Sequence, residues 1–173
     1  AAYQLGKLYL GGEGILKDVS EALRWLNLSA KQKNQFAEYA LGCLYLKGED
    51  VPKDVAKAIS HLKSAAIKGN EFAEYRLGKL YLIGEDVPKN METALQYLTA
   101  SANQGNQYAQ YTLGKLYLMG KDVLKDKEEA VKWFTLSAAQ GNIYAQFFLD
   151  HIDEFKEPSV MLAATRLLHH MSR

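Results

Sequence analysis

The side chains that could carry out chemistry are few, and they do not form a known catalytic pattern. The histidines are His61, His151 and the adjacent pair His169-His170, and the single cysteine is Cys43. Zinc sites need several cysteine or histidine ligands at characteristic spacings. These residues do not provide such a set, so the sequence predicts no metal site.

Motifs for phosphate binding and for nucleophilic catalysis are also missing from the sequence. It contains no G-x-x-x-x-G-K-[ST], no G-x-G-x-x-G and no G-x-S-x-G. Its glycines recur at a fixed period, which indicates helix packing and helix ends. The loop carboxylates Glu49-Asp50 and Glu85-Asp86 recur in the same way and are expected to be solvated. We therefore predict no catalytic residue, no cofactor and no enzyme activity in this chain.

A repeat of 36 residues organises the chain. Residues 73–108 align without insertion with residues 37–72 and with residues 109–144. Residues 1–36 give the same pattern, and Ala145 opens a fifth copy that soon decays, since Asp150 takes the place of a repeated glycine. A period of this length is typical of helical repeat proteins.

Each copy predicts two helices. Apolar residues three and four apart, such as Ala37 and Leu41, mark the buried face of the first helix. Gly42 lies inside this helix, where glycine costs about 1 kcal/mol relative to alanine, so we expect a neighbouring helix to approach closely there. Asp54 is expected to cap the second helix. The counterparts of Gly42 are Gly6, Gly78 and Gly114, and those of Asp54 are Asp18, Asn90 and Asp126.

Glycines also predict where the helices end. Gly48 and its counterparts can adopt the left-handed backbone that terminates the first helix, and Gly69 and its counterparts can end the second. Lys33 takes the place of Gly69 in the first copy, which predicts a less regular turn. Val51 is expected to anchor the loop between the helices.

Two antiparallel helices cannot bury their apolar faces alone, so successive copies must stack to complete the core. The predicted fold is all-α, a right-handed α-solenoid of antiparallel helix pairs with a concave and a convex side. Residues 1–149 would hold four repeats and a partial fifth, and residues 150–157 a hinge or helix end. Residues 158–173 would form an amphipathic capping helix, or alternatively a helix that docks on other parts of a longer protein.

The pattern A-x-x-x-L-G-x-x-Y-x-x-G-x-x-x-x-K-D-x-x-x-A resembles the Sel1-like repeat family. The resemblance covers residues 1 to about 149 and implies a fold similar to tetratricopeptide arrays, together with a role as an adaptor that holds other proteins. In the second copy the pattern is carried by Ala37, Leu41, Gly42, Tyr45, Gly48, Lys53, Asp54, Ala58, Ala65, Ala66 and Gly69.

The last segment, Ser159–Arg173, resembles the tail that follows such repeats in plasmid-mobilisation relaxases of Gram-positive bacteria. This resemblance implies a C-terminal accessory region of a DNA-transfer protein, whose nicking domain would lie upstream. The chain starts at Ala1, in phase with a repeat and without a methionine, so we expect it to be a fragment of a longer protein. No catalytic residue of the relaxases can be placed on it.

The candidate binding residues lie on the first helix of each repeat, away from its buried stripe. Phe36 and Tyr39 are three residues apart and share a face, and both positions are aromatic in the next copies. In tetratricopeptide-like arrays, these positions line the inner groove. We expect the lysines that follow to be solvated and able to pair with acidic groups of a peptide. The predicted partner-binding residues are Phe36, Tyr39, Phe72, Tyr75, Lys79, Tyr108, Tyr111 and Lys115.

Alternatives remain for the aromatic rows. Tyr39 and its counterparts Tyr75 and Tyr111 could pack between repeats rather than face the groove. A second row, with Tyr45 in the second copy, belongs to the repeat signature and is expected to pack between helices.

Composition limits the classes of partner. A formal net charge of +1 gives no broad electrostatic footprint, so direct nucleic-acid binding is not expected. No apolar run approaches the roughly 18 residues of a membrane-spanning helix. The single cysteine excludes an internal disulfide and fits a reducing compartment, so a cytoplasmic location is expected.

The predicted function is a non-catalytic protein–protein interaction scaffold that binds a partner peptide or helix in its concave groove. The alternatives are the relaxase accessory region described above and a structural spacer within a longer protein.

Overall fold

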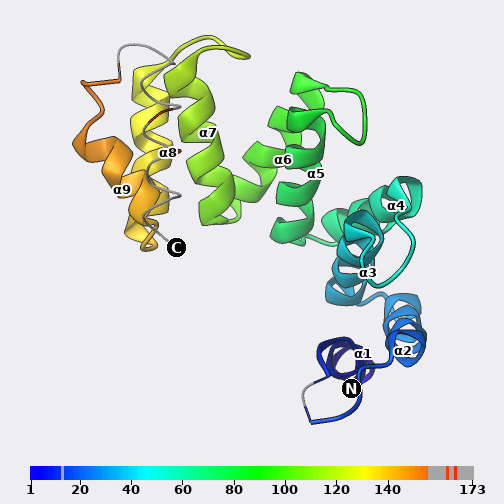
Figure 1. Ribbon diagram of the computed structural model, residues 1–173. Coiled ribbons are helices and arrows are strands. Elements are labelled where there is room, and N and C mark those ends of the chain that lie inside the picture. The colour runs from blue at the N-terminus through cyan, green and yellow to red at the C-terminus, as the bar shows by residue number, and fades with distance from the viewer. Residues whose placement is uncertain (13, 156–162, 164–165, 167–173) are drawn as a thin grey trace. The chain divides into compact units, whose positions relative to one another are not determined.

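The computed structural model describes residues 1–12, 14–155, 163 and 166, and every regular element in that part of the chain is a helix. The chain forms two compact units, Ala1–Asn90 and Met91–Arg173, which we call unit 1 and unit 2 and describe separately (Figure 1). The prediction of an all-helical fold is confirmed for the described residues.

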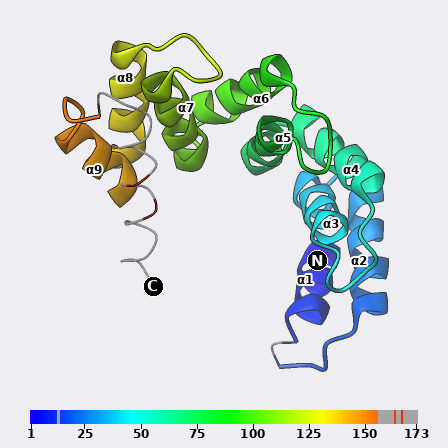
Figure 2. The same cartoon turned by 45° about the horizontal axis from the view of Figure 1, so that its top comes forward.

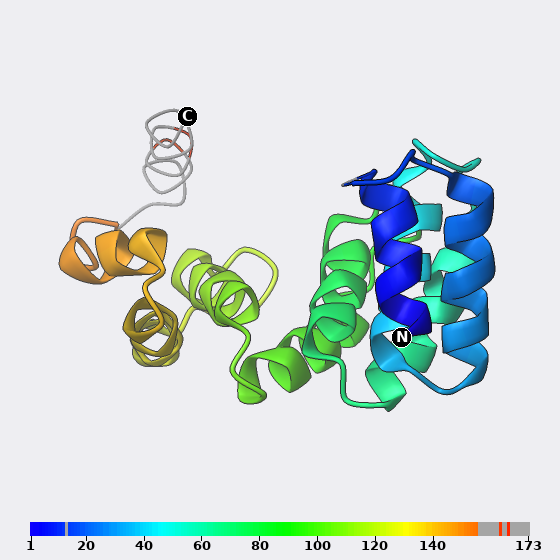
Figure 3. The same ribbon diagram turned by 90° about the horizontal axis from the view of Figure 1, so that it is seen from below.

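Unit 1 contains two helix pairs and the first helix of a third. Helix α1 packs along α2, α3 packs along α4, and the pairs stack through α2 on α3 and α4 on α5. Figure 3 shows α1 and α2 side by side, as expected for helices joined by a short loop. The helices are α1 (Ala2–Gly11), α2 (Val19–Lys31), α3 (Gln35–Lys47), α4 (Val55–Ile67) and α5 (Glu71–Ile83).

Unit 2 continues the same alternation. Helix α6 packs on α7, α7 pairs with α8, and α9 packs on α8 and also reaches α7 (Figure 2). The helices are α6 (Met91–Asn103), α7 (Gln107–Met119), α8 (Lys127–Ala139) and α9 (Ile143–Asp150). The predicted capping helix over residues 158–173 lies outside the described residues, except for 163 and 166, and stays a prediction.

Glycines inside the first helices let the members of each pair approach closely. A Cβ atom on Gly42 would stand 2.7 Å from Cγ of Leu62, and one on Gly6 would stand 2.7 Å from Cγ of Leu26. In unit 2 a Cβ on Gly114 would stand 2.7 Å from the ring of Phe134. Real Cβ atoms do not make contacts this short, so any side chain would push the two helices apart. The close approach predicted from the sequence is confirmed in these three copies.

The loop within each helix pair is closed by repeated hydrogen bonds. The Asp54 carboxylate accepts a hydrogen bond from the Lys57 amide at 2.9 Å, and the Asp54 amide donates to the Tyr45 carbonyl at 3.0 Å. Val51, which belongs to this loop, is buried. The same carboxylate cap forms at Asp18 and Asp126, so the predicted N-caps are confirmed at three positions.

The turn at Lys33 is as regular as its glycine counterparts, so the prediction of a less regular turn is wrong. The Lys33 amide donates to the Ala30 carbonyl at 2.8 Å, as the Gly69 amide does to Ala66 at 2.8 Å. Lys33 reaches this geometry with a φ of 63°, in the left-handed region that a side chain disfavours.

Replacing Lys33 by glycine is expected to raise the free energy of unfolding by about 1 kcal/mol, because glycine adopts the left-handed backbone without a Cβ clash. The control is Lys33→Ala, which keeps the Cβ atom and should give no such gain. Urea denaturation followed through Trp25, which lies on the adjacent helix α2, measures both variants. Equal stabilities of the glycine and alanine variants would contradict backbone strain at this position.

Candidate functional site

The predicted partner-binding residues lie on α3, α5 and α7, which are the first helices of three repeats. The aromatic residue in the first turn of each helix is open to solvent: Phe36 is 48% exposed, Phe72 is 41% exposed and Tyr108 is 51% exposed. The other five are half-buried: Tyr39, Tyr75, Lys79, Tyr111 and Lys115.

An asparagine fixes the start of each of these helices. The Asn34 side-chain oxygen accepts hydrogen bonds from the amides of Phe36 at 2.9 Å and Ala37 at 3.1 Å. Asn70 and Asn106 cap α5 and α7 in the same way. Because the cap orders the first turn, it also positions the exposed aromatic residue. The sequence analysis missed these caps, although an asparagine stands at this position in every copy.

Within unit 1 the aromatic rings touch from one repeat to the next. The ring centroids of Tyr39 and Phe72 lie 6.1 Å apart, and those of Tyr3 and Phe36 also lie 6.1 Å apart. Tilted ring pairs at this distance stabilise the packing of the helices that carry them. We call Tyr3, Phe36, Tyr39 and Phe72 the aromatic face of unit 1.

In unit 2 the equivalent tyrosine is surrounded by more rings. The Tyr111 centroid lies 6.0 Å from Phe134, 6.1 Å from Phe148 and 6.1 Å from Tyr144. The Lys115 ammonium lies 5.5 Å from the centre of the Tyr111 ring, which is a cation–π contact. Tyr111 therefore packs between repeats on most of its surface, and Tyr108 is the open aromatic side chain on α7.

Two cations stand three residues apart on α5. Arg76 is exposed and interacts electrostatically with Tyr39 on α3. Burial lowers the pKa of Lys79, and the charge of Arg76 lowers it further. Lys79 is thus half-buried, and the expectation that it is solvated is wrong. The sequence analysis did not single out Arg76, since its counterparts Ala40 and Thr112 carry no charge.

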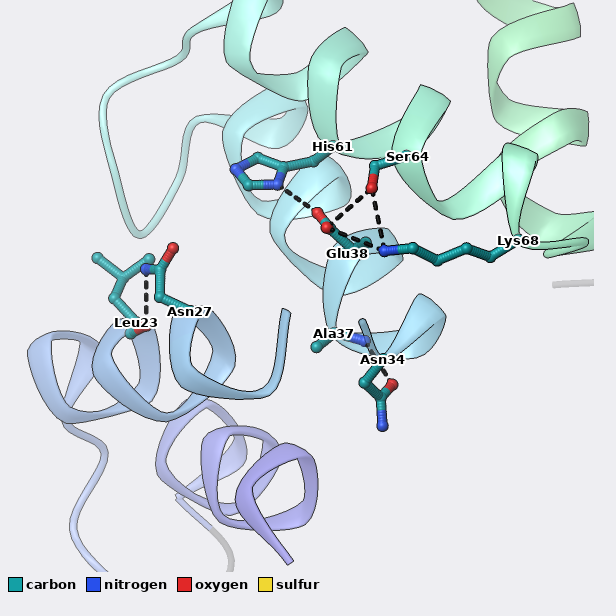
Figure 4. A network of polar contacts seen from close by, with 8 residues as sticks. All are labelled: Leu23, Asn27, Asn34, Ala37, Glu38, His61, Ser64 and Lys68. Atoms are coloured by element: carbon teal, nitrogen blue, oxygen red, sulfur yellow. Dashed lines mark hydrogen bonds and ion pairs between the residues drawn. The ribbon is translucent and has the colours of Figure 1, made fainter. Parts of the chain in front are cut away.

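Buried Glu38 joins α3 to α4 (Figure 4). One carboxylate oxygen contacts Nδ1 of His61 at 2.7 Å, and the other accepts hydrogen bonds from Ser64 at 2.8 Å and Lys68 at 3.3 Å. Burial alone would raise the pKa of Glu38, but the hydrogen bonds from His61, Ser64 and Lys68 outweigh it, and the pKa lies below its ordinary value.

Glu38, His61 and Ser64 have the residue types of a hydrolase triad but not its arrangement. In such a triad the histidine lies between the serine hydroxyl and the acid, so that it can take the serine proton. Here His61 and Ser64 both contact the Glu38 carboxylate. These contacts fasten two helices together and do not activate a nucleophile. The sequence signal for this position is a polar residue after the buried alanine in the second to fifth copies: Glu38, Glu74, Gln110 and Gln146.

The loop carboxylates, which we predicted to be solvated, make ion pairs between repeats. Asp50 lies 2.5 Å from the Lys17 ammonium of the preceding repeat, and Asp86 lies 2.6 Å from Lys53. Both aspartates are exposed, as predicted, but their ion pairs were not predicted, because stacking brings the loops of successive repeats together. Contacts of this kind are not visible within one copy.

The Lys53–Asp86 pair is expected to contribute a coupling free energy of about 0.5 kcal/mol, since both side chains are partly exposed. A double-mutant cycle with Lys53→Ala and Asp86→Ala, followed by urea denaturation, measures it. High salt should reduce the coupling because it screens exposed charges. Lys17→Ala combined with Asp86→Ala serves as the control and should be additive. A coupling that salt leaves unchanged would argue against an electrostatic origin.

Metal and membrane sites were sought in the same structure. Within its described residues, no group of three or more His, Cys, Asp and Glu side chains could hold a metal ion. None of the described helices is long and apolar enough to cross a bilayer.

Similar structures have been solved from several bacteria. A protective antigen present in uropathogenic Escherichia coli strains shares 34% identity and a TM-score of 0.79 over 83% of this chain and 31% of its own. A Sel1 repeat protein from Oxalobacter formigenes shares 35% identity and a TM-score of 0.78 over 83% of this chain and 59% of its own. An immunity protein from Pseudomonas aeruginosa shares 27% identity and a TM-score of 0.61 over 91% of this chain and 58% of its own.

This chain therefore spans between about a third and three fifths of the length of these three proteins. No curated protein sequence matches it. The Sel1 repeat family matches residues 1–34, 35–70, 72–106 and 107–142, and the first described structure displays the same repeat fold. Since these matches cover most of the sequence, the chain belongs to the Sel1 repeat family and has its α-solenoid fold of stacked helix pairs.

Proposed function

We propose that this chain is a non-catalytic scaffold that binds a peptide or a helix of a partner protein in a groove lined by its first helices. One observation carries the proposal. In three successive repeats, a large aromatic side chain in the first turn of the first helix is between 41% and 51% exposed. Exposed aromatic residues that recur on one helix face provide rigid apolar area for a partner, and such residues dominate protein interfaces.

The eight predicted residues have different roles in this proposal. Phe36 and Phe72 provide open apolar surface in unit 1, and Tyr108 provides it in unit 2. The half-buried tyrosines support that surface by packing against rings of the next repeat, as Tyr39 does against Phe72. The lysines lie beside the rings and would contact polar groups of the partner. The whole set is Phe36, Tyr39, Phe72, Tyr75, Lys79, Tyr108, Tyr111 and Lys115.

Membership of the Sel1 repeat family supports a non-catalytic role, because these repeats generally serve as scaffolds. The two alternatives remain predictions. The segment that resembles relaxase tails lies almost wholly outside the described residues. A role in contact with DNA would produce binding that falls steeply with salt, which a titration with single- and double-stranded DNA would reveal. A structural spacer would bind neither protein nor DNA.

The double substitution Phe36→Ser/Phe72→Ser is expected to weaken capture of a partner from lysate of the source organism by tenfold or more, or roughly 1.4 kcal/mol, because interface aromatics often contribute this much. Quantitative mass spectrometry of proteins retained on the immobilised chain provides the measurement.

The matched control is Leu16→Ser/Leu124→Ser. Both leucines are exposed, at 91% and 89%, and they lie in loops rather than on the first helices. This control should retain the partner. If the Phe36→Ser/Phe72→Ser protein keeps its helical circular dichroism and still captures the same partner, binding does not use this face.

A further inference from the structure

Arg76 and Lys79 form a cationic pair beside the aromatic face of unit 1. Phe72, Arg76 and Lys79 follow one another at spacings of four and three on α5, so they share one side of the helix. Arg76 interacts electrostatically with Tyr39 on α3, and the Tyr39 ring contacts Phe72. The two positive charges therefore border the same exposed rings that we propose as a partner surface.

Among the described residues that affect the charges of Arg76 and Lys79, none is a carboxylate. Arg76 interacts with Tyr39, Cys43 and Tyr75, whereas Lys79 is affected by its burial and by Arg76. The buried carboxylate of Glu38, on the neighbouring helix α3, is instead held by His61, Ser64 and Lys68.

The arrangement is unfavourable for Lys79 in the unbound chain. Like charges three residues apart on a helix repel each other. Partial burial of the Lys79 ammonium adds a desolvation cost. A bound anion would relieve both, because it would neutralise the pair and provide acceptors for donors that have lost water.

We propose that the cationic pair of Arg76 and Lys79 binds a carboxylate of an acidic partner peptide whose apolar side chains pack on Phe36 and Phe72. This inference rests on the function proposed above and names the chemistry of the partner. Arginine offers a planar fork that can hold both carboxylate oxygens, and lysine adds a mobile point charge. The carboxylate could belong to a side chain or to the C-terminus of the peptide.

An acidic peptide fits better than a nucleic acid. Single-stranded nucleic acids are bound along a positively charged groove that follows many phosphates. The chain has a formal net charge of only +1, and the site has one close pair of cations. Two neighbouring cations match one or two carboxylates.

The proposed preference for an acidic peptide applies to unit 1. In unit 2 the position of Arg76 is occupied by Thr112, whose hydroxyl donates to the Tyr108 carbonyl at 2.7 Å. Lys115, the counterpart of Lys79, lies over the Tyr111 ring. The matched control is Lys63→Gln, which removes an exposed lysine from α4 and lies outside the proposed partner-binding residues.

The test is a selection from a random peptide library displayed on phage, with the full chain immobilised. We expect the selected peptides to be enriched in Asp and Glu relative to the starting library. Synthetic copies should bind Arg76→Gln/Lys79→Gln about tenfold more weakly, since the peptide carboxylate loses both charged donors. Their affinity for Lys63→Gln should not change.

Further synthetic peptides identify the source of the carboxylate. Loss of binding on Asp→Asn or Glu→Gln replacement would place it on a side chain, and loss on amidation would place it at the C-terminus. Either result supports the inference.

Three outcomes would overturn it. Selected peptides that bind Arg76→Gln/Lys79→Gln normally but fail to bind Phe36→Ser/Phe72→Ser would leave the proposed function standing without the acidic preference. A selection that enriches no peptide on the native chain would count against both proposals. The third outcome concerns a short single-stranded DNA that binds the native chain and displaces the peptides. If this DNA bound Arg76→Gln/Lys79→Gln more weakly, the pair would be assigned to nucleic-acid binding.

Discussion

Replacing Phe134 by alanine is expected to lower the free energy of unfolding of unit 2 by about 4 kcal/mol. Phe134 is fully buried on α8, and its ring stacks on Phe148 with 5.3 Å between centroids. It also fills the space left by Gly114, whose missing side chain lets α7 and α8 approach. Truncation would therefore lose both the transfer free energy of the ring and the packing around it, because Gly114 cannot fill the cavity.

The two tryptophans allow this loss to be assigned to one unit. Trp25 lies in unit 1 and Trp133 lies on α8, where it is 6% exposed. In a Trp25→Phe background, the fluorescence of Trp133 reports on unit 2 alone during urea denaturation.

The matched control for this prediction is Phe134→Leu. Leucine stands at the same position in the other repeats, as Leu26, Leu62 and Leu98. This variant leaves a smaller void, so its expected cost is about 1 kcal/mol. If the alanine variant were no less stable than the leucine variant, the surrounding rings would have to collapse into the cavity, and the rigid packing described here would be wrong.

Features that repeat within a single copy could be predicted from the sequence. The close approach at Gly42 and the cap at Asp54 depend on residues of one helix pair, and the same residue types recur at one period. Local backbone geometry is sufficient to predict such features. The Lys33 turn shows the limit of this reasoning, because the hydrogen bonds of the turn hold a lysine in a conformation that its own preference disfavours.

Contacts between helices or between repeats could not be predicted from one copy. The pairing of Lys53 with Asp86 depends on how the loops stack, and the contact of His61 with Glu38 depends on two helices together. Similarly, the repeat pattern placed the aromatic residues on the first helix of each repeat. It could not show that Tyr39 and Tyr111 would have different surroundings, because these depend on which rings the neighbouring repeat contributes.

The most informative of these unpredicted contacts is the one at Glu38. Glu38→Gln is expected to lower the free energy of unfolding at neutral pH by about 2 kcal/mol, because hydrogen bonds to a charged group contribute about 1.5–3 kcal/mol. Glutamine keeps the shape of the side chain but loses the charge that Lys68 and His61 face. Gln110 occupies the same position in unit 2, so the helix pair tolerates this side chain.

The difference in the free energy of unfolding between the unchanged chain and Glu38→Gln should depend on pH. The pKa of Glu38 is lower in the folded chain than its ordinary value of 4.5, so the unfolded chain takes up the proton more readily. The stabilisation is therefore complete above the unfolded pKa and is lost as the pH falls through the folded pKa. We expect the stability of the unchanged chain to fall more steeply in acid than that of Glu38→Gln, until the two converge.

Urea denaturation over this range of pH, followed through Trp25 in a Trp133→Phe background, measures the effect in unit 1. The control is Glu85→Gln, which removes an equal charge from an exposed loop position and should leave the pH dependence almost unchanged. If the unchanged chain and Glu38→Gln lost stability in parallel as the pH falls, the ionised carboxylate would make no net contribution to the free energy of folding. In that case the contacts with His61, Ser64 and Lys68 would only compensate for the burial of the charge, and the link between α3 and α4 would come from apolar packing alone.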